Sequence, residues 1–92
     1  MITAMLYMQP GCIESVSAAA VLAEHHVPFL TRDVRHDEEA AVECVDWFRE
    51  ERSDSVPATP VVVLAGGRVC FGAMELHAHL SESRIGGELL AA

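Results

Sequence analysis

The chain has 92 residues, of which 51% are hydrophobic, and it carries a formal net charge of −8 at pH 7. This length suits one domain with a single core of two or three layers, and the composition excludes intrinsic disorder. Its cations are six arginines without a lysine, which excludes nucleic acid and anionic membrane surfaces as expected partners.

We expect one monomeric domain over residues 1–92, with a core at 2–83 and a C-terminal tail at 84–92. The first residues lack both a basic region and an apolar run long enough for a signal peptide, so the predicted location is cytoplasmic. The three cysteines do not suggest a disulfide scaffold, because an odd number leaves at least one thiol free.

Two apolar patterns open the chain. Residues 2–8 form a nearly continuous apolar run, typical of a strand buried on both faces, which stops at Pro10 and Gly11. Residues 13–26 are rich in alanine and contain no glycine or proline, so they predict a helix. Helical spacing predicts that its buried face consists of Val16, Ala19, Ala20, Ala23 and Val27.

A second strand and a second helix follow. Residues 27–34 predict the strand, and Pro28 suits either its beginning or the edge of a sheet. Residues 37–52 predict the helix, which three acidic residues open where the helix dipole favours them. The predicted apolar face of this helix consists of Ala41, Cys44, Val45 and Phe48.

The last third of the chain predicts a hairpin and a short helix. Residues 61–64 give a strong strand signal, and a glycine turn at 66–67 leads to a partner strand at 69–71. A helix is expected from 75 to about 83, followed by a frayed tail from Gly86. The order βαβαββα predicts an α/β fold in which a four-stranded mixed sheet has helices on both faces.

The turn after the first strand is the candidate functional site, because ligands gather at the carboxyl ends of parallel strands. Cys12 follows this turn in the first turn of a helix, whose partial positive charge favours the thiolate, the nucleophilic form. Ser15 stands where a second cysteine would complete a redox pair, and its hydroxyl can donate a hydrogen bond to the thiolate. The sequence therefore predicts a reactive thiol without a local resolving cysteine.

Several motifs follow one another along the chain with a consistent order and spacing. They are Tyr7-x-x-Pro10-Gly11-Cys12-x-x-Ser15, Ala18-x-x-Val21-Leu22, Val27-Pro28-Phe29, Asp33-Val34, Thr59-Pro60-Val61 and Gly72-Ala73-Met74-Glu75. With these motifs, residues 2–80 resemble the glutaredoxin branch of the thioredoxin fold.

The resemblance implies a cis bond before Pro60, with Pro57 as the competing position, and a backbone at Thr59 that pairs with an extended peptide such as glutathione. It implies no metal and no tightly bound cofactor, and makes glutathione or a similar low-molecular-weight thiol the co-substrate. The implied partners are small-thiol mixed disulfides or glutathionylated proteins. Beside the catalytic Cys12 and Ser15, the implied thiol-binding residues are Gln9, Pro10, Gly11, Thr59, Pro60, Gly72, Ala73, Met74 and Glu75.

The site also departs from the family pattern. Gln9 stands where many glutaredoxins have a basic residue. Ala73 and Met74 stand where a glycine and an acidic residue are frequent, which leaves Glu75 to hold the amino end of a substrate. The carboxylate of Glu14, ~6–7 Å from the thiolate, is expected to oppose its ionisation by ~0.6–0.7 kcal/mol, which is similar to the helix contribution.

The remaining cysteines and the histidines are expected to be structural. Cys44 lies on an apolar helix face, and Cys70 lies in a strand between apolar residues, so both are predicted core residues. Cys70 would be a resolving thiol if its sulfur came near Cys12. The pairs His25–His26 and His77–His79 do not have the spacing that places two ligands on one helix face.

Two arginines near the end of the second predicted helix have alternative roles. Arg49 and Arg52 could reach a substrate carboxylate, as residues of this region do in the family. We expect instead a solvated helix end, in which they pair with neighbours such as Asp46 or Glu50.

The predicted function is thiol–disulfide exchange of the monothiol kind. Cys12 would attack a glutathione-type mixed disulfide, take up the small thiol and be released by a second small thiol. The alternatives are an iron–sulfur cluster carrier and a thioredoxin-fold adaptor without chemistry. Monothiol glutaredoxins that hold a cluster carry Cys-Gly-Phe-Ser, whereas this chain has Cys12-Ile13-Glu14-Ser15, so exchange is the preferred prediction.

Overall fold

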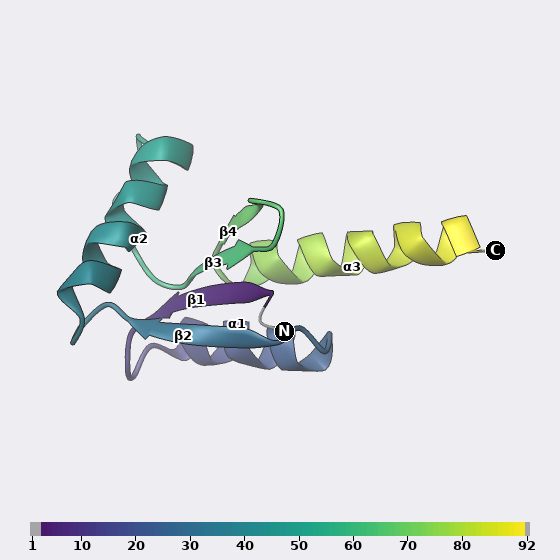
Figure 1. Cartoon of the computed structure of the whole chain (residues 1–92), viewed down its shortest axis with the longest axis horizontal. Coiled ribbons are helices and arrows are strands. Elements are labelled where there is room, and N and C mark those ends of the chain that lie inside the picture. The colour runs from purple at the N-terminus through teal and green to yellow at the C-terminus, as the bar shows by residue number, and fades with distance from the viewer. Residues whose placement is uncertain (1–2, 92) are drawn as a thin grey trace.

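The computed structural model describes the backbone of residues 3–91 and the side chains of residues 3–82. Residues 1, 2 and 92, which the predicted first strand and the predicted domain include, lie outside the described part. The elements are β1 (Ala4–Met8), α1 (Ile13–Glu24), β2 (Phe29–Asp33), α2 (Glu38–Glu51), β3 (Val61–Leu64), β4 (Val69–Phe71) and α3 (Ala73–Ala91), shown in Figure 1.

The strands form one mixed sheet in the order β2-β1-β3-β4. β1 runs parallel to β2 and antiparallel to β3, and β3 pairs antiparallel with β4. Tyr7 near the end of β1 is paired with Arg32 on one side and Val61 on the other. The predicted four-stranded mixed sheet is confirmed, and the end of β1 leads directly into the turn before Cys12.

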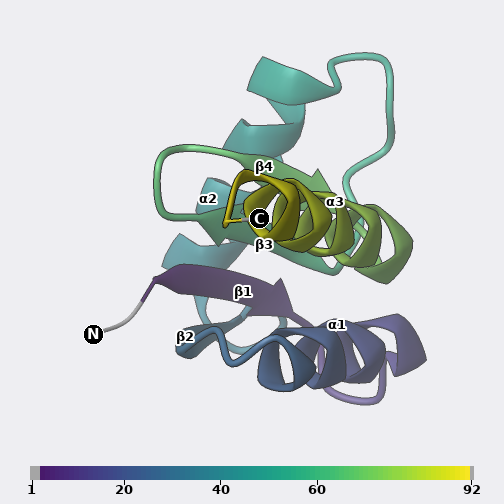
Figure 2. The ribbon, with the colours of Figure 1, turned by 90° about the vertical axis from the view of Figure 1, so that its right-hand side faces the viewer.

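The sheet separates two hydrophobic cores. One lies against α1 and α3 and includes Leu6, Leu22 and Leu76, while the other lies against α2 and includes Tyr7 and Phe48. Figure 2 shows α1 and α3 on one face of the sheet and α2 on the opposite face. Because the neighbours Leu6 and Tyr7 enter different cores, β1 is buried on both faces, as its apolar run predicts.

The buried face of α1 differs from the prediction. Its buried residues are Ser15, Ala18 and Leu22, whereas Val16 is exposed. Burial of the large Leu22 side chain in the core gains more than burial of an alanine and therefore sets the rotation of the helix. The small alanines gain less from burial, so they follow the orientation that buries Leu22.

α2 has the predicted acidic start, and α3 is longer than predicted. Asp37 caps α2, where its Oδ1 accepts a hydrogen bond from the Ala40 N–H at 3.2 Å. The tail expected from Gly86 is instead helical to Ala91, since the residues after the two glycines are good helix formers. Among the described residues, no helix combines the length and the apolar character needed to cross a membrane.

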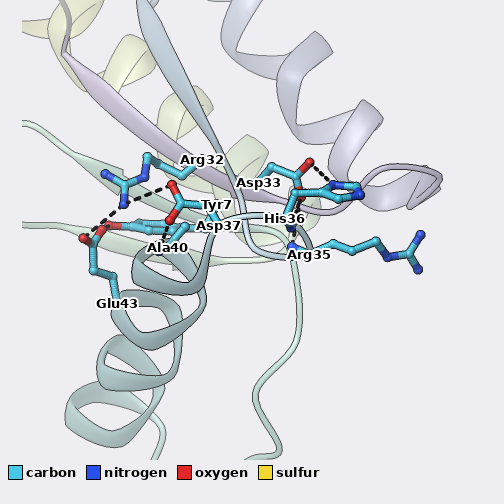
Figure 3. A network of polar contacts seen from close by, with 8 residues as sticks. All are labelled: Tyr7, Arg32, Asp33, Arg35, His36, Asp37, Ala40 and Glu43. Carbon is cyan, nitrogen blue, oxygen red and sulfur yellow. Dashed lines mark hydrogen bonds and ion pairs between the residues drawn. The ribbon is translucent and has the colours of Figure 1, made fainter.

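A polar network joins β1, β2 and α2 beside the α2 core (Figure 3). The Tyr7 hydroxyl donates to Glu43 Oε1 at 2.6 Å, and Arg32 Nη2 donates to Glu43 Oε2 at 3.2 Å. Arg32 also lies 3.8 Å from Asp37. Burial and then the bond to Glu43 raise the pKa of Tyr7 from 10.0 to about 12. Folding therefore favours the neutral, protonated form of the Tyr7 side chain.

Tyr7→Phe is expected to lower the free energy of unfolding by about 1–2 kcal/mol at neutral pH, because the bond to a charged acceptor is lost. The raised pKa means that the unfolded chain loses this proton first, so the stabilisation by Tyr7 is lost between about pH 10 and 12. Urea denaturation of both proteins across this range measures the difference. A wild-type protein that lost no more stability than the variant over this range would contradict the assigned bond.

Candidate active site

Cys12 occupies the N-cap position of α1, directly after the turn that ends β1. Its N–H donates to the carbonyl of Gln9 at 3.1 Å, and its own carbonyl accepts from the Val16 N–H at 3.2 Å. Gly11 in this turn has a φ of +81°, a conformation that suits glycine. The turn and the first helical bond thus fix the Cys12 backbone, while the side chain stays partly exposed.

The Thr59 hydroxyl donates a hydrogen bond to the sulfur of Cys12, whose pKa lies below its ordinary value. The hydrogen bond from the Ser15 hydroxyl lowers the pKa of Cys12 most, followed by the Ser15 N–H. The Thr59 hydroxyl, whose Oγ1 lies 3.7 Å from Sγ, and the Glu14 N–H lower it further, whereas burial opposes them. These donors favour the thiolate, and the role of Ser15 in holding it stays a prediction.

Ser15 is itself held in place. Its side chain is 2% exposed on the inner face of α1, and its Oγ accepts a bond from the Gln9 N–H at 3.4 Å. The Ser15 hydroxyl thus accepts a hydrogen bond from the turn, and its own proton is available for the sulfur of Cys12.

The expected opposition from the Glu14 carboxylate is not among the principal influences on the Cys12 pKa. Glu14 Oε1 lies 3.0 Å from the place where a Cβ on Gly72 would stand. The carboxylate thus points to the start of α3, and a side chain at Gly72 would have to displace it and adopt a φ of +96°, which favours glycine.

The thiol-binding residues predicted around Thr59 lie together. The Thr59–Pro60 peptide bond is cis, Pro60 is buried, and its carbonyl accepts from the Gly72 N–H at 3.0 Å. A groove of about 180 Å³ extends from this loop toward α2. It is lined by Gln9, Val34, Ala41, Cys44, Val45, Pro57, Ala58 and Thr59.

Glu75, one of the predicted thiol-binding residues, forms an ion pair with Arg52. Both of its carboxylate oxygens accept from Arg52 Nη2 at 3.0 Å, and the Arg52 guanidinium lies 4.9 Å from the centre of the Phe71 ring. The expected pairing of Arg52 with neighbours on its own helix is therefore wrong, although Arg49 does lie 3.9 Å from Asp46. Glu75 is already paired and is a weaker candidate for a substrate amino group.

The other cysteines fit their predicted core positions. Cys44 and Cys70 are buried in the two cores, and burial raises the pKa of both thiols. All three cysteines are free. Among the side chains that the structure describes, at residues 3–82, no group of three or more His, Cys, Asp or Glu could hold a metal ion. Among the three thiols, Cys12 alone is both accessible and activated.

Comparison with known proteins identifies the family and the fold of the chain. Residues 4–69 match the glutaredoxin family model. Similar solved structures include a glutaredoxin from Brucella melitensis, which is 25% identical with a TM-score of 0.66 and coverage of 95% of this chain and 87% of that one. The thioredoxin-like protein BC3987 is 28% identical with a TM-score of 0.61, over 84% of this chain and 97% of its own.

A dithiolic glutaredoxin from Trypanosoma brucei brucei shares the fold, with a TM-score of 0.72 at 15% identity over 94% of this chain and 84% of that one. A search of curated proteins finds no match. The family model covers well over half of the chain, from the first strand into the last. The protein therefore has the thioredoxin fold and belongs to the glutaredoxin family.

Proposed function

We propose that the protein is a monothiol thiol–disulfide oxidoreductase that exchanges thiols through Cys12. The observation that carries the proposal is the set of donors at the Cys12 sulfur, which lower its pKa while Cys44 and Cys70 are buried. Membership of the glutaredoxin family supports a role in thiol–disulfide exchange. The monothiol character follows from Ser15, which stands where a second cysteine would resolve the intermediate.

The reaction has two exchange steps that balance without an external oxidant. The Cys12 thiolate attacks the small-thiol sulfur of a mixed disulfide, the S–S bond breaks, and the substrate thiol leaves as a thiolate that takes up a proton. A second small thiolate then attacks the adduct on Cys12, which releases a small-molecule disulfide and regenerates the Cys12 thiolate. Glutathione or a similar low-molecular-weight thiol is the co-reactant.

The residues around Cys12 are suited to these steps. The Ser15 and Thr59 hydroxyls hold the thiolate before attack and stabilise it again as the leaving group of the second step. The groove between Gln9 and Thr59 would hold the small thiol as an extended chain against the Thr59 backbone. We assign the protein to a reducing compartment such as the cytoplasm, acting as a monomer, since small thiols supply the reducing equivalents there.

Treatment of the reduced protein with oxidised glutathione is expected to add one glutathione moiety to Cys12. Intact-mass spectrometry measures this adduct, and excess reduced glutathione should remove it. The Cys12→Ser variant is expected to form no adduct, because the attacking thiolate is missing.

The matched control is Cys70→Ala, which removes a thiol buried in the core between the sheet, α1 and α3 and is expected to keep a single adduct. An adduct that formed in Cys12→Ser, or a wild-type protein that formed none, would show that Cys12 does not carry out this exchange. A coloured product with visible absorbance after anaerobic reconstitution with iron and sulfide would instead favour a cluster carrier.

A further inference from the structure

Four large apolar side chains are exposed on the segments that meet at Cys12. They are Ile13, Val16, Val56 and Met74, which are between 68% and 87% exposed. Single exposed apolar side chains are common on protein surfaces, whereas a group of them around a nucleophile indicates an interaction site. We call these four residues the apolar rim.

Contacts between distant segments bring the rim residues to the same end of the sheet. Ile13 and Val16 belong to the first turn of α1, beside Cys12. The Glu14 carboxylate approaches Gly72, which brings the start of α3, and with it Met74, to that turn. The Thr59–Cys12 contact brings Thr59, three residues after Val56, to the sulfur.

Carboxylates lie in and beside the rim, whereas the exposed Arg35 lies on the β2 side of the active-site turn, where the Val34 N–H donates to the Met8 carbonyl. Glu14 lies within the rim, and the exposed Asp54 is two residues from Val56. Arg52, the nearest cation in the same loop region, is already paired with Glu75. The whole chain has a net charge of −8, so a second copy of the same protein would be repelled from this surface.

We propose that the apolar rim docks the polypeptide side of a mixed disulfide, and that the preferred segment is apolar and carries a basic residue next to its cysteine. This inference rests on the proposed exchange at Cys12. The rim would bury the apolar side chains of the segment, while Glu14 would pair with its cation. The groove on the α2 side is left for the small thiol.

The same basic residue favours the first exchange step. When Cys12 attacks the sulfur of the small thiol, the cysteine of the segment leaves as a thiolate, and a neighbouring cation stabilises that charge. This chemical advantage exists with any attacking thiol. The contribution of Glu14 must therefore be separated from it by a variant of the protein.

The test uses three synthetic glutathionylated peptides in the presence of reduced glutathione. One has valines and leucines with lysine beside the cysteine, the second replaces the lysine by glutamate, and the third replaces the apolar residues by serine and glycine. The wild-type protein is expected to deglutathionylate the first peptide about tenfold faster than either of the others, measured as kcat/KM by mass spectrometry.

Variants assign the preference to the rim. Ile13→Ser and Val56→Ser are expected to lower the preference for the apolar peptide over the serine–glycine peptide about three- to tenfold. Glu14→Gln is expected to reduce the preference for lysine over glutamate about two- to fivefold. Val42→Ser, which changes an exposed valine of α2, is the matched control and is expected to keep the wild-type preferences.

Equal rates with all three peptides, or an equal loss in Val42→Ser, would overturn the inference while leaving exchange at Cys12 intact. Dimerisation of the wild-type protein in sedimentation, abolished by Ile13→Ser, would overturn it in favour of a second copy as the occupant. A failure of Cys12 to react with both the peptides and oxidised glutathione would overturn the proposed function together with the inference.

Discussion

Ser15→Ala is expected to slow the reaction of Cys12 with iodoacetamide roughly three- to tenfold at neutral pH. The Ser15 hydroxyl gives the largest contribution that lowers the Cys12 pKa, and a hydrogen bond to a charged group contributes about 1.5–3 kcal/mol. Its loss raises the pKa and reduces the fraction of thiolate. A more basic thiolate is a somewhat better nucleophile, which offsets part of the decrease. Alkylation rates across a pH series should shift as a whole to higher pH.

The control for this variant is Ser17→Ala, which removes an exposed hydroxyl from the same helix. It is expected to keep the wild-type alkylation profile. Because Ser15 is buried and accepts the Gln9 N–H, circular dichroism should accompany the measurement to show that the variant is folded. A folded Ser15→Ala protein with the wild-type profile would show that Ser15 does not activate the thiol.

Leu22→Ala is expected to lower the free energy of unfolding by about 3 kcal/mol, within the 2–5 kcal/mol typical of such truncations. Leu22 is fully buried in the core that α1 and α3 form with the sheet, beside Leu6 and Leu76. The free energy of unfolding of such a domain is about 5–15 kcal/mol in total, so this loss is a large share of its stability. Urea denaturation under reducing conditions measures it.

The comparison is Leu30→Ala on β2, where the leucine is 52% exposed. This substitution is expected to lower the free energy of unfolding by less than about 1 kcal/mol, because little apolar area returns to water. Similar losses for the two leucines would show that the orientation assigned to α1 is wrong. The face predicted from its valine and alanines would then be the buried one.

Elements set by local pattern were predictable from the sequence. The apolar runs at 2–8 and 61–64 and the glycine turn at 66–67 correspond to β1, β3 and the hairpin, because strand burial and turn geometry depend on adjacent residues. The face of α1 was not predictable in this way. Its alanines fit several rotations of the helix, and the packing of Leu22 between sheet and α3 selects one of them.

The candidate site also combines relations that follow from local spacing with relations that depend on tertiary packing. Cys12 and Ser15 lie on one helical turn, so their relation follows from spacing alone. Thr59 and Gly72 were expected there only because the order of motifs resembles a known family. The pairing of Glu75 with Arg52 joins residues 23 positions apart, and it depends on how α2 and α3 meet around the sheet. Local charge pattern therefore assigned Arg52 to the wrong partner.

That ion pair has a consequence for how molecules of this protein behave in concentrated solution. β4 has three residues and a neighbour on one side only, so its outer edge can accept a strand from another chain. A hollow of about 230 Å³ beside β4 is lined by the charged side chains Glu51, Arg52, Arg68 and Glu75, together with Gly67, Val69 and Phe71. An incoming strand would have to desolvate these charged side chains and separate Arg52 from Glu75. The pair thereby protects the sheet edge against aggregation.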